Sequence, residues 1–430
     1  MSTRVELLPP AQPAEATLRH LAAFALHHGL PVALWRLPQA GSAVQLCLSF
    51  SADAALAGLP PALEPTAPAG FAFFPFRDSD HNPALFLPAD VVFDATQPGQ
   101  VRIQEDAPGA ATQLPELLQW LQAPASPSPE PPTKNEQPTT KNEQPTTHTV
   151  LPWHVSPQPA PHTATQAEYT ALVERGVAAI AGGQVLKVVS SRAARQSLPA
   201  DFDALAAFGE LTRRYPLAFC SLVSAPGAGT WLGATPEILV QVTEDGQFCT
   251  MALAGTQPAL PGHAPSEAIW RQKEIEEQAL VARYIVNCFK QLRLREYQET
   301  GPRTVAAGEL LHLRTDFAVD LRRVPFPTLG TDMLRLLHPT SAVGGMPRQA
   351  ALEFIDQHEG YDRAYYSGFL GPVNLPTPGA ARLYVNLRCL QLRPHEAILY
   401  AGTGLTVDSD PAREWQETEL KLRTAGAILN

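Results

Sequence analysis

The chain has 430 residues, with 32 Lys and Arg against 42 Asp and Glu and a formal net charge of −10. This length suits two or three domains, or a single large protein built on α/β sheets. Because the basic residues form no block, we expect no nucleic-acid partner and no anionic membrane surface, although a local cationic pocket for a small anion stays open.

The five cysteines are an odd number without a closely spaced pair, which favours neither a disulfide framework nor a zinc site and indicates a reducing compartment. No apolar run reaches 18 residues, and no apolar segment follows Arg4. We therefore expect a soluble, cytoplasmic protein that acts as a monomer.

The first 122 residues mix short apolar runs with turn residues. Helical spacing of apolar residues predicts helices over 14–28 and 114–121, and apolar runs predict strands over 31–37, 44–50 and 70–76. A proline-dense stretch then holds 11 prolines in the 38 residues 124–161 and repeats Pro-Thr-Thr-Lys-Asn-Glu-Gln. Such a polar repeat cannot bury enough apolar surface to order itself, so we expect a linker or surface insertion.

Regular structure resumes with a helix over 167–180, which two glycines end, and a strand over 184–192. Lys187 lies among apolar residues of this strand. It could reach water from a sheet edge, or it could be desolvated and serve as a base, because burial disfavours the ammonium form.

A helix over 203–215 and strands over 217–223 and 230–232 lead to Pro-Glu at 236–237, where an apolar strand begins. A carboxyl there would be desolvated, which would raise the pKa of Glu237 and suit a proton donor; the alternative is a turn residue that faces water. The strand over 251–256 is expected to end in a turn of small residues, where backbone can approach a ligand.

The longest predicted helix covers 266–292 and carries Glu277, an acid that could turn inward toward a metal. On the strand over 310–315, His312 is expected to be a core or edge histidine. A loop over 336–347 and a helix over 350–356 follow. Two strands, 381–392 and 397–401, come next, and Arg388 in the first is a candidate carboxylate clamp, because a guanidinium among apolar residues needs an anion.

The last strand is predicted to break at Gly402 and Gly404, and a helix restarts with Asp410 at its N-cap. Three charged residues of this helix, Glu414, Glu417 and Lys421, are spaced to share one face. They could hold a divalent cation beside a ligand carboxylate, or they could form ion pairs on a solvated surface.

Taken in order, these segments resemble the chorismate-utilising enzymes over about 165–424. The matching motifs are Leu-Lys-Val-Val-Ser-Ser-Arg (186–192), Gly-Ala-Thr-Pro-Glu (233–237), Ala-Leu-Ala-Gly-Thr (252–256), the stretch 273–278, His-Pro-Thr with Gly-Gly (338–345), Arg-Cys (388–389), and Ala-Gly-x-Gly with Glu-Trp-x-Glu-Thr (401–418).

The resemblance implies an α+β fold in one large domain, with two stacked antiparallel β-sheets flanked by helices. Residues 1–122 would be the variable N-terminal part of this fold, 123–164 a Pro-rich low-complexity linker or insertion, and 165–430 the chorismate-binding catalytic core.

Within the family, members that add water resemble this chain in having lysine at position 187, whereas the aminating members typically have glutamine. Water needs a base to become a nucleophile and ammonia does not. Ala254 also stands where aminodeoxychorismate synthases place a nucleophilic lysine. The resemblance therefore implies a Mg²⁺-dependent isomerase that forms isochorismate by attack of water at C2 of chorismate and loss of the C4 hydroxyl.

By resemblance, Lys187 is the base and Glu237 the acid, and Glu277, Glu414 and Glu417 hold Mg²⁺. The expected substrate-binding residues are Ala254, Gly255, Thr256, His338, Tyr366, Arg388, Gly402, Gly404 and Lys421.

Three positions depart from the usual family pattern: Ser190, where leucine is usual, Glu274, where aspartate is usual, and Gln278, where histidine or asparagine is usual. The alternatives are a salicylate synthase, which eliminates pyruvate after forming isochorismate, an anthranilate synthase component I, and a non-catalytic chorismate-binding protein. Menaquinone biosynthesis is the expected pathway, with siderophore biosynthesis as the alternative.

Overall fold

Two large antiparallel β-sheets form the centre of the protein. The computed structural model describes residues 3–8, 13–39, 41–53, 60–122, 151–259 and 262–429. The larger sheet has 11 strands. In spatial order they are β1 (Thr3–Leu7), β7 (Gln100–Gln104), β6 (Val91–Asp94), β3 (Val44–Leu48), β2 (Val32–Arg36), β9 (Phe219–Ala225), β10 (Gly229–Thr235), β18 (Cys389–Leu392), β19 (Glu396–Leu405), β8 (Lys187–Ser197) and β15 (Gly345–Met346).

The smaller sheet has 8 strands. In spatial order they are β13 (Gln298–Ala307), β14 (Leu310–Asp320), β12 (Gln247–Pro258), β11 (Ile238–Val242), β17 (Ala381–Val385), β16 (Phe369–Val373), β4 (Gly70–Phe74) and β5 (Leu85–Pro88). Residues from the first 122 therefore pair with later strands in both sheets, β2 with β9 and β4 with β16.

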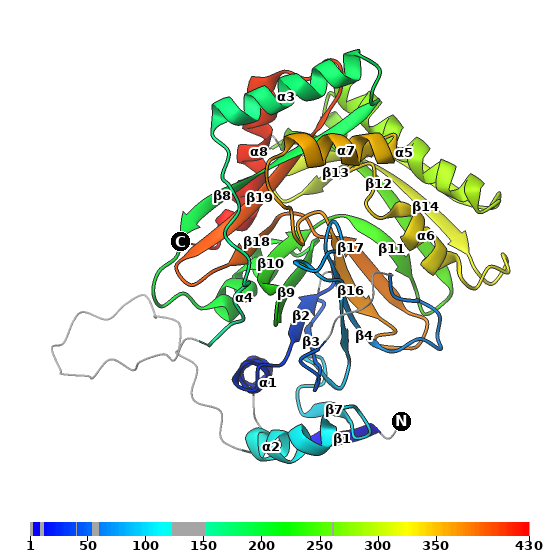
Figure 1. Ribbon diagram of the computed structural model, residues 1–430. Helices are drawn as coiled ribbons and strands as arrows, with labels where there is room; N and C mark the ends of the chain where they lie inside the picture. Colours follow the sequence, from blue (N-terminus) through cyan, green and yellow to red (C-terminus); the bar gives the residue numbers. More distant parts are fainter. Residues whose placement is uncertain are drawn as a thin grey trace.

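Helices cover the outer faces of the two sheets (Figure 1). They are α1 (Ala14–His27), α2 (Ala110–Gln122), α3 (Gln166–Ala181), α4 (Ala204–Arg214), α5 (Gln272–Gln291), α6 (Leu329–Leu337), α7 (Arg348–His358) and α8 (Pro411–Gly426). Helices α1, α2 and α4 share one apolar cluster with the larger sheet, and α5 and α6 share another with the smaller sheet. This layering buries an apolar face of each helix, which is the usual way to build a large α+β domain.

A third apolar cluster, rich in aromatic rings, fills the space between the sheets. Phe73 stacks on Tyr365 with ring centroids 4.1 Å apart, and Trp231 stacks on Tyr400 at 5.4 Å. Large rings bury much apolar area each, so this cluster fixes how the sheets lie on one another.

Several predicted elements are confirmed with small shifts at their ends. Helices form where they were expected over 14–28, 167–180 and 350–356, and Asp410 caps α8 by accepting a hydrogen bond from the Arg413 amide at 3.0 Å. The first part of the proline-rich stretch, 123–150, lies outside the described residues, and 151–164 form no helix or strand.

The glycine-rich end of the last strand was predicted wrongly. Strand β19 continues through Gly402 and Gly404 to Leu405, paired throughout with β8. The strand over 251–256 likewise continues to Pro258, with a bulge instead of a turn at Gly255, whose φ is +70°. In each case one neighbouring strand, β8 beside β19 and β14 beside β12, continues past the glycines and carries them in the sheet.

Two further boundaries differ from the sequence prediction. The helix predicted from 266 begins at Gln272. A short 3-10 helix, Pro265–Glu267, comes first, and the chain is extended at Ala268 and Arg271, while Trp270 donates a hydrogen bond to Thr304 Oγ1 at 2.9 Å. The strand predicted over 381–392 is two strands, β17 and β18, that belong to different sheets. None of the helices in the described part of the chain has the length and apolar character that crossing a membrane demands.

Candidate active site

At one place the chain crosses twice from one sheet to the other. Strand β10 of the larger sheet leads through Pro236 and Glu237 to β11 of the smaller sheet, and β17 leads back through residues 386–388 to β18. These segments run side by side, since β10 pairs with β18 and β11 with β17. Two backbone hydrogen bonds join the crossing segments, from Val385 N to Glu237 O at 3.0 Å and from Ala234 N to Arg388 O at 3.2 Å. The two crossings therefore bring Glu237 and Arg388 to one junction.

A cavity lies at this junction, with an envelope of about 640 Å³ that includes space open to solvent. Ten of the predicted site residues line it: Glu237, Ala254, Gly255, Thr256, Glu277, Tyr366, Arg388, Gly402, Gly404 and Lys421. Its apolar walls include Val189, Leu253, Val343 and Leu387. A small number of polar groups set in an apolar cavity is the usual composition of a small-molecule site.

Arg388 enters the cavity from a strained backbone position, with φ of +50°. Its Nη2 lies 3.2 Å from His312 Nε2, and its Nη1 donates to Thr424 Oγ1 at 3.2 Å. Among the described residues no carboxylate lies within ion-pair distance of this buried guanidinium, and burial lowers the pKa of Arg388. A buried charge without a counter-ion is costly, so the arrangement favours an anionic ligand.

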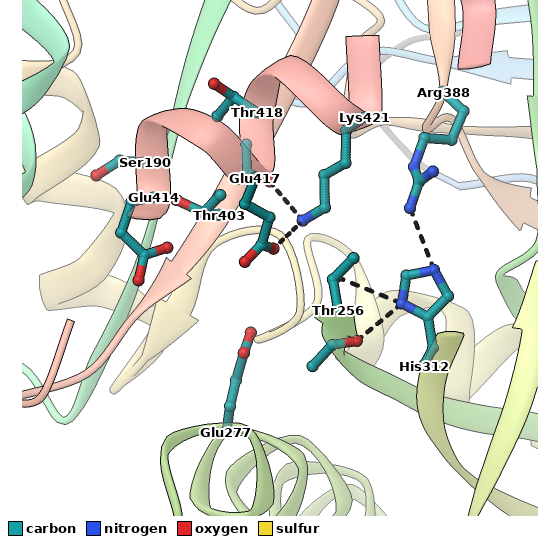
Figure 2. A network of polar contacts seen from close by, with 12 residues as sticks. Ser190, Thr256, Glu277, His312, Arg388, Thr403, Glu414, Glu417, Thr418 and Lys421 are labelled. Atoms are coloured by element: carbon teal, nitrogen blue, oxygen red, sulfur yellow. Dashed lines mark hydrogen bonds and ion pairs between the residues drawn. The ribbon is translucent and has the colours of Figure 1, made fainter. Parts of the chain in front are cut away.

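His312 is a cavity residue that the sequence interpretation assigned to the core. Its Nδ1 lies 2.8 Å from Gly255 O, and burial together with the Arg388 charge lowers the pKa of His312 to about 3. A guanidinium can only donate and a carbonyl can only accept, so Nε2 accepts from Arg388 and Nδ1 carries the proton. His312 is thus a neutral imidazole that fixes one side of the guanidinium (Figure 2). No signal in the sequence indicated this role, because the pairing that brings His312 beside β12 is a tertiary contact.

Glu237 is kept protonated by its surroundings. Its side chain is buried, and burial raises the pKa of Glu237 to about 8, against the opposing charges of Lys187, Lys421 and Arg388. A carboxylic acid that is neutral near pH 7 can donate a proton or a hydrogen bond. The expectation that this carboxyl is desolvated is confirmed, and the alternative of a turn residue facing water is wrong.

Lys187 is completely buried at the start of β8, so the alternative of a lysine that reaches water is wrong. Its Nζ lies 3.1 Å from Glu277 Oε1, without the angles of a hydrogen bond. Gly404 permits this pair, because a Cβ at position 404 would lie 2.0 Å from Glu277 Oε1 and 3.0 Å from Lys187 Cε. Glycine at 404 therefore leaves room for these two side chains in their present positions.

The charged face of α8 turns inward. Glu414 Oε1 lies 2.5 Å from Lys273 Nζ, and Glu417 Oε1 lies 2.7 Å from Lys421 Nζ. Burial raises the pKa of Glu414, whereas for Glu417 the Lys421 and Lys273 charges outweigh burial and lower its pKa. The alternative of ion pairs on a solvated helix surface is wrong, since Glu414 is only 2% exposed.

Three carboxylates point toward one another from two helices. Figure 2 shows Glu277 on α5 directed toward α8, from which Glu414 and Glu417 project. Within the described ranges no group of three or more His, Cys, Asp and Glu side chains is close enough to hold a metal, and each of these acids is paired with a lysine. Glu414 Oε2 is nevertheless buried without a hydrogen-bond partner. Carboxylate oxygens are the donors that a hard divalent cation prefers, so the donor set fits Mg²⁺.

The backbone of Gly402 faces away from β8. Its carbonyl accepts a hydrogen bond from Lys421 Nζ at 2.8 Å, and in an antiparallel strand the N–H and C=O of one residue point to the same side. Strand β18 pairs with β19 only as far as Leu399. The peptide edge of residues 402–404 is therefore open toward α8, where it can meet a ligand.

Two of the predicted substrate-binding residues, Tyr366 and His338, differ in where they lie relative to the cavity. Tyr366 lines the cavity and stacks on Tyr400, with ring centroids 5.3 Å apart. His338 is not among the residues that line the cavity; its Nε2 lies 3.1 Å from Pro75 O, and burial lowers its pKa to about 3. In this structure His338 is a half-buried residue that packs on Phe369.

A buried ion pair that sequence reasoning missed supports one cavity wall. Arg363 and Glu359 lie 2.6 Å apart and are almost fully buried. Arg363 also donates to the carbonyls of Val189 and Val343, each at 2.7 Å, and both valines line the cavity. The pair therefore joins β8 to the loop before β15 behind the site.

Comparison with known proteins identifies the family. A family model described as chorismate binding enzyme matches residues 62–430. The chain therefore belongs to the chorismate-binding enzyme family.

Individual relatives agree with this assignment. The chain is 30% identical over 265 residues to isochorismate synthase EntC of Escherichia coli K12, a match covering 60% of this chain and 66% of EntC. It is 38% identical over 204 residues to the salicylate biosynthesis isochorismate synthase of Pseudomonas aeruginosa, covering 46% of this chain and 41% of that protein. These matches span less than two thirds of each relative's length.

The fold itself is shared with a solved structure, MenF, the menaquinone-specific isochorismate synthase from Escherichia coli. The TM-score is 0.71 at 21% identity, with 100% of this chain and 95% of that chain covered. The expected α+β fold with two antiparallel sheets is confirmed.

Proposed function

We propose that this protein is an isochorismate synthase, which converts chorismate to isochorismate. The observation that carries the proposal is one cavity with a protonated buried acid, Glu237, at its wall and a buried amine, Lys187, directly behind Gly404. Moving a hydroxyl between two ring carbons requires a base for the incoming water and an acid for the departing oxygen. The relatives named isochorismate synthase support the same reaction.

In the proposed reaction Lys187 takes a proton from water, which attacks C2 of the ring. The ring double bonds shift, and the C4 hydroxyl leaves as water with a proton from Glu237. Arg388, which has no carboxylate partner among the described residues, binds a carboxylate of the substrate, and Tyr366 lies beside it. His312 holds the guanidinium in place as a neutral acceptor.

Magnesium is part of this proposal. Glu277, Glu414 and Glu417 would hold the ion, and Lys421 with the open peptide edge at Gly402 would lie beside the second carboxylate of the substrate. When bound, the ion supplies positive charge that neutralises this carboxylate. Binding would require the lysine pairs of these glutamates to loosen, since the acids now make their contacts with lysine.

Product analysis tests the proposal. Purified protein is incubated with chorismate and Mg²⁺, with and without ammonia, and the products are separated by chromatography. Isochorismate as the accumulating product supports the proposal. Salicylate with pyruvate would show a salicylate synthase, anthranilate with ammonia an anthranilate synthase component I, and unchanged chorismate a binding protein without activity.

Two variants and a chelator test the residue roles. Lys187→Gln should abolish turnover, whereas Lys290→Gln, on the exposed face of α5, should leave it unchanged. Retained turnover in Lys187→Gln would show that Lys187 is not the base. EDTA should stop the reaction and added Mg²⁺ should restore it, while activity that survives chelation would remove the metal from the proposal.

A further inference from the structure

A second hollow adjoins the cavity and shares three of its lining residues, Pro236, Leu253 and Arg388. We call it the vestibule. Its outer walls are the segment 214–218, which follows α4, and the end of β13 at 304–308. Its envelope of about 1910 Å³ is wider than the 640 Å³ of the cavity. A ligand of the size that the cavity accepts can therefore occupy it.

The vestibule is positively charged in a protein that is negative overall. Its described lining residues include four arginines, Arg214, Arg314, Arg382 and Arg388, and no Asp or Glu, although the net charge of the chain is −10. Two of them are neutralised, Arg314 by Asp316 at 2.6 Å and Arg382 by Glu244 at 3.0 Å.

The other two arginines, Arg214 and Arg388, have no ion-pair partner among the residues that the structure describes. Arg214 is exposed and Arg388 is buried. The vestibule thus has one uncompensated cation at its mouth and one at its inner end. A cleft of one sign raises the local concentration of ions of the opposite sign.

Arg388 stands at the boundary between the two spaces. One end of its guanidinium meets Thr424, which lines the vestibule, and the other meets His312, which lines the cavity. Both partners are neutral, and both hydrogen bonds are 3.2 Å long. A carboxylate arriving from the vestibule would offer Arg388 a bidentate ion pair, in which the acceptor carries a charge as well as the donor. The guanidinium can therefore exchange its present partners for the ligand.

The cleft along α8 is a poorer route to the cavity. It shares Arg214, Tyr215 and Thr424 with the vestibule but no lining residue with the cavity, and it mixes Glu309 and Glu419 with its arginines. Its mixed charge would not favour a dianion over other solutes.

We propose that the vestibule is the route by which the dicarboxylate substrate enters the cavity, with Arg214 attracting it and Arg388 receiving it. This inference rests on the proposed function, because the negative charge of the substrate follows from that function. Arg214 acts on encounter only and takes no part in the reaction.

Charge reversal at two adjacent arginines tests the route. Arg214→Glu is compared with Arg213→Glu, whose parent residue is likewise exposed, pairs with Glu210 at 2.5 Å and does not line the vestibule. With chorismate in about 50 mM salt, we expect Arg214→Glu to lower kcat/KM at least fivefold with kcat unchanged, and the loss to fade towards 0.5 M salt, where the Debye length is only a few Å. Equal kcat/KM in the two variants, or a loss independent of salt, would overturn the proposal.

A blocking experiment gives an independent measurement. Ala306→Cys places a thiol at the exposed wall of the vestibule, and Ala178→Cys places one on the exposed face of α3 as a control. Both are made with Cys249→Ser, because Cys249 is half-buried and the other four cysteines are buried. After labelling with a bulky maleimide, kcat/KM should fall more than tenfold at position 306 and stay unchanged at 178. Unchanged kinetics at a fully labelled position 306 would refute the route.

Failure of the route and failure of the proposed function give different results. The product is identified with the unsubstituted protein, whereas the route is judged from the ratio of kcat/KM for chorismate between the variants. A parent that forms anthranilate would end the proposed function and leave the route to be judged on those ratios.

Discussion

Replacing Gly404 by alanine tests the packing that places Lys187 and Glu277. The added methyl would lie 2.0 Å from Glu277 Oε1, whereas ordinary contacts begin at 3.4 Å, so the carboxylate must move by about 1.4 Å. The Lys187 amine lies 3.1 Å from that oxygen and must move with it. A misplacement of about 1 Å in a catalytic group can lower the rate by about 100-fold. We therefore expect kcat for isochorismate formation to fall at least 100-fold.

Stability should fall less than activity in this variant. Inserting one methyl into a packed site costs about 1–3 kcal/mol, so Gly404→Ala should still fold. Gly209→Ala is the matched control, because a Cβ at this position in α4 meets nothing within 4 Å. It should keep full activity and gain about 0.5–1 kcal/mol, since alanine favours a helix over glycine. Steady-state kinetics and denaturant unfolding measure both effects, and wild-type kcat in a folded Gly404→Ala would refute the proposed role of the Lys187–Glu277 pair.

Three further predictions concern neighbouring groups. Because the pKa of Glu237 is raised to about 8, kcat should fall as pH rises through about 8, and Glu237→Gln should lose turnover. Between about pH 4.5 and 8 only the folded state keeps the proton on Glu237. The parent protein should therefore lose stability relative to this variant as pH rises, by about 1.4 kcal/mol per pH unit at most. His312→Phe removes the acceptor of Arg388 and should raise KM at least tenfold, while the pKa of His312 near 3 means that this histidine causes no loss of parent activity between pH 5 and 7. Glu359→Gln breaks a buried ion pair and should cost about 3–5 kcal/mol of unfolding free energy, whereas Glu210→Gln in an exposed pair should cost less than about 1 kcal/mol.

Distinct measurements check these three. A pH–rate profile that stays flat to pH 9.5 would contradict the role of Glu237 as acid. Unchanged KM in a folded His312→Phe would show that the imidazole does not support Arg388. Equal unfolding midpoints in urea for the variants at 359 and 210 would contradict the structural importance of the buried pair.

The sequence by itself determined the features that depend on local chemistry. Apolar spacing was enough for α1 and α3, and Asp410 with Pro411 was enough for the start of α8, because capping and periodicity act within one element. The Pro-Glu step at the opening of an apolar strand left two alternatives for Glu237, a desolvated carboxyl and a turn residue facing water, and burial in the tertiary structure decided for the first.

Contacts between distant segments were decided only by the tertiary structure. A strand signal over 381–392 gave no reason to expect two strands in different sheets, because sheet membership depends on which partners lie alongside. The same holds for His312, whose character as a site residue comes from Arg388, 76 positions away in sequence.

The last strand shows the physical reason most clearly. Two glycines favour a break when the segment is read alone, but β8 pairs with β19 past both of them, and the side chains of Lys187 and Glu277 fill the space that a Cβ at 404 would need. The sequence shows that a glycine is present, and only the packing of β8, α5 and β19 shows which side chains require it. Local propensity acts over a few residues, whereas the free energy of pairing and burial comes from segments that the fold brings together.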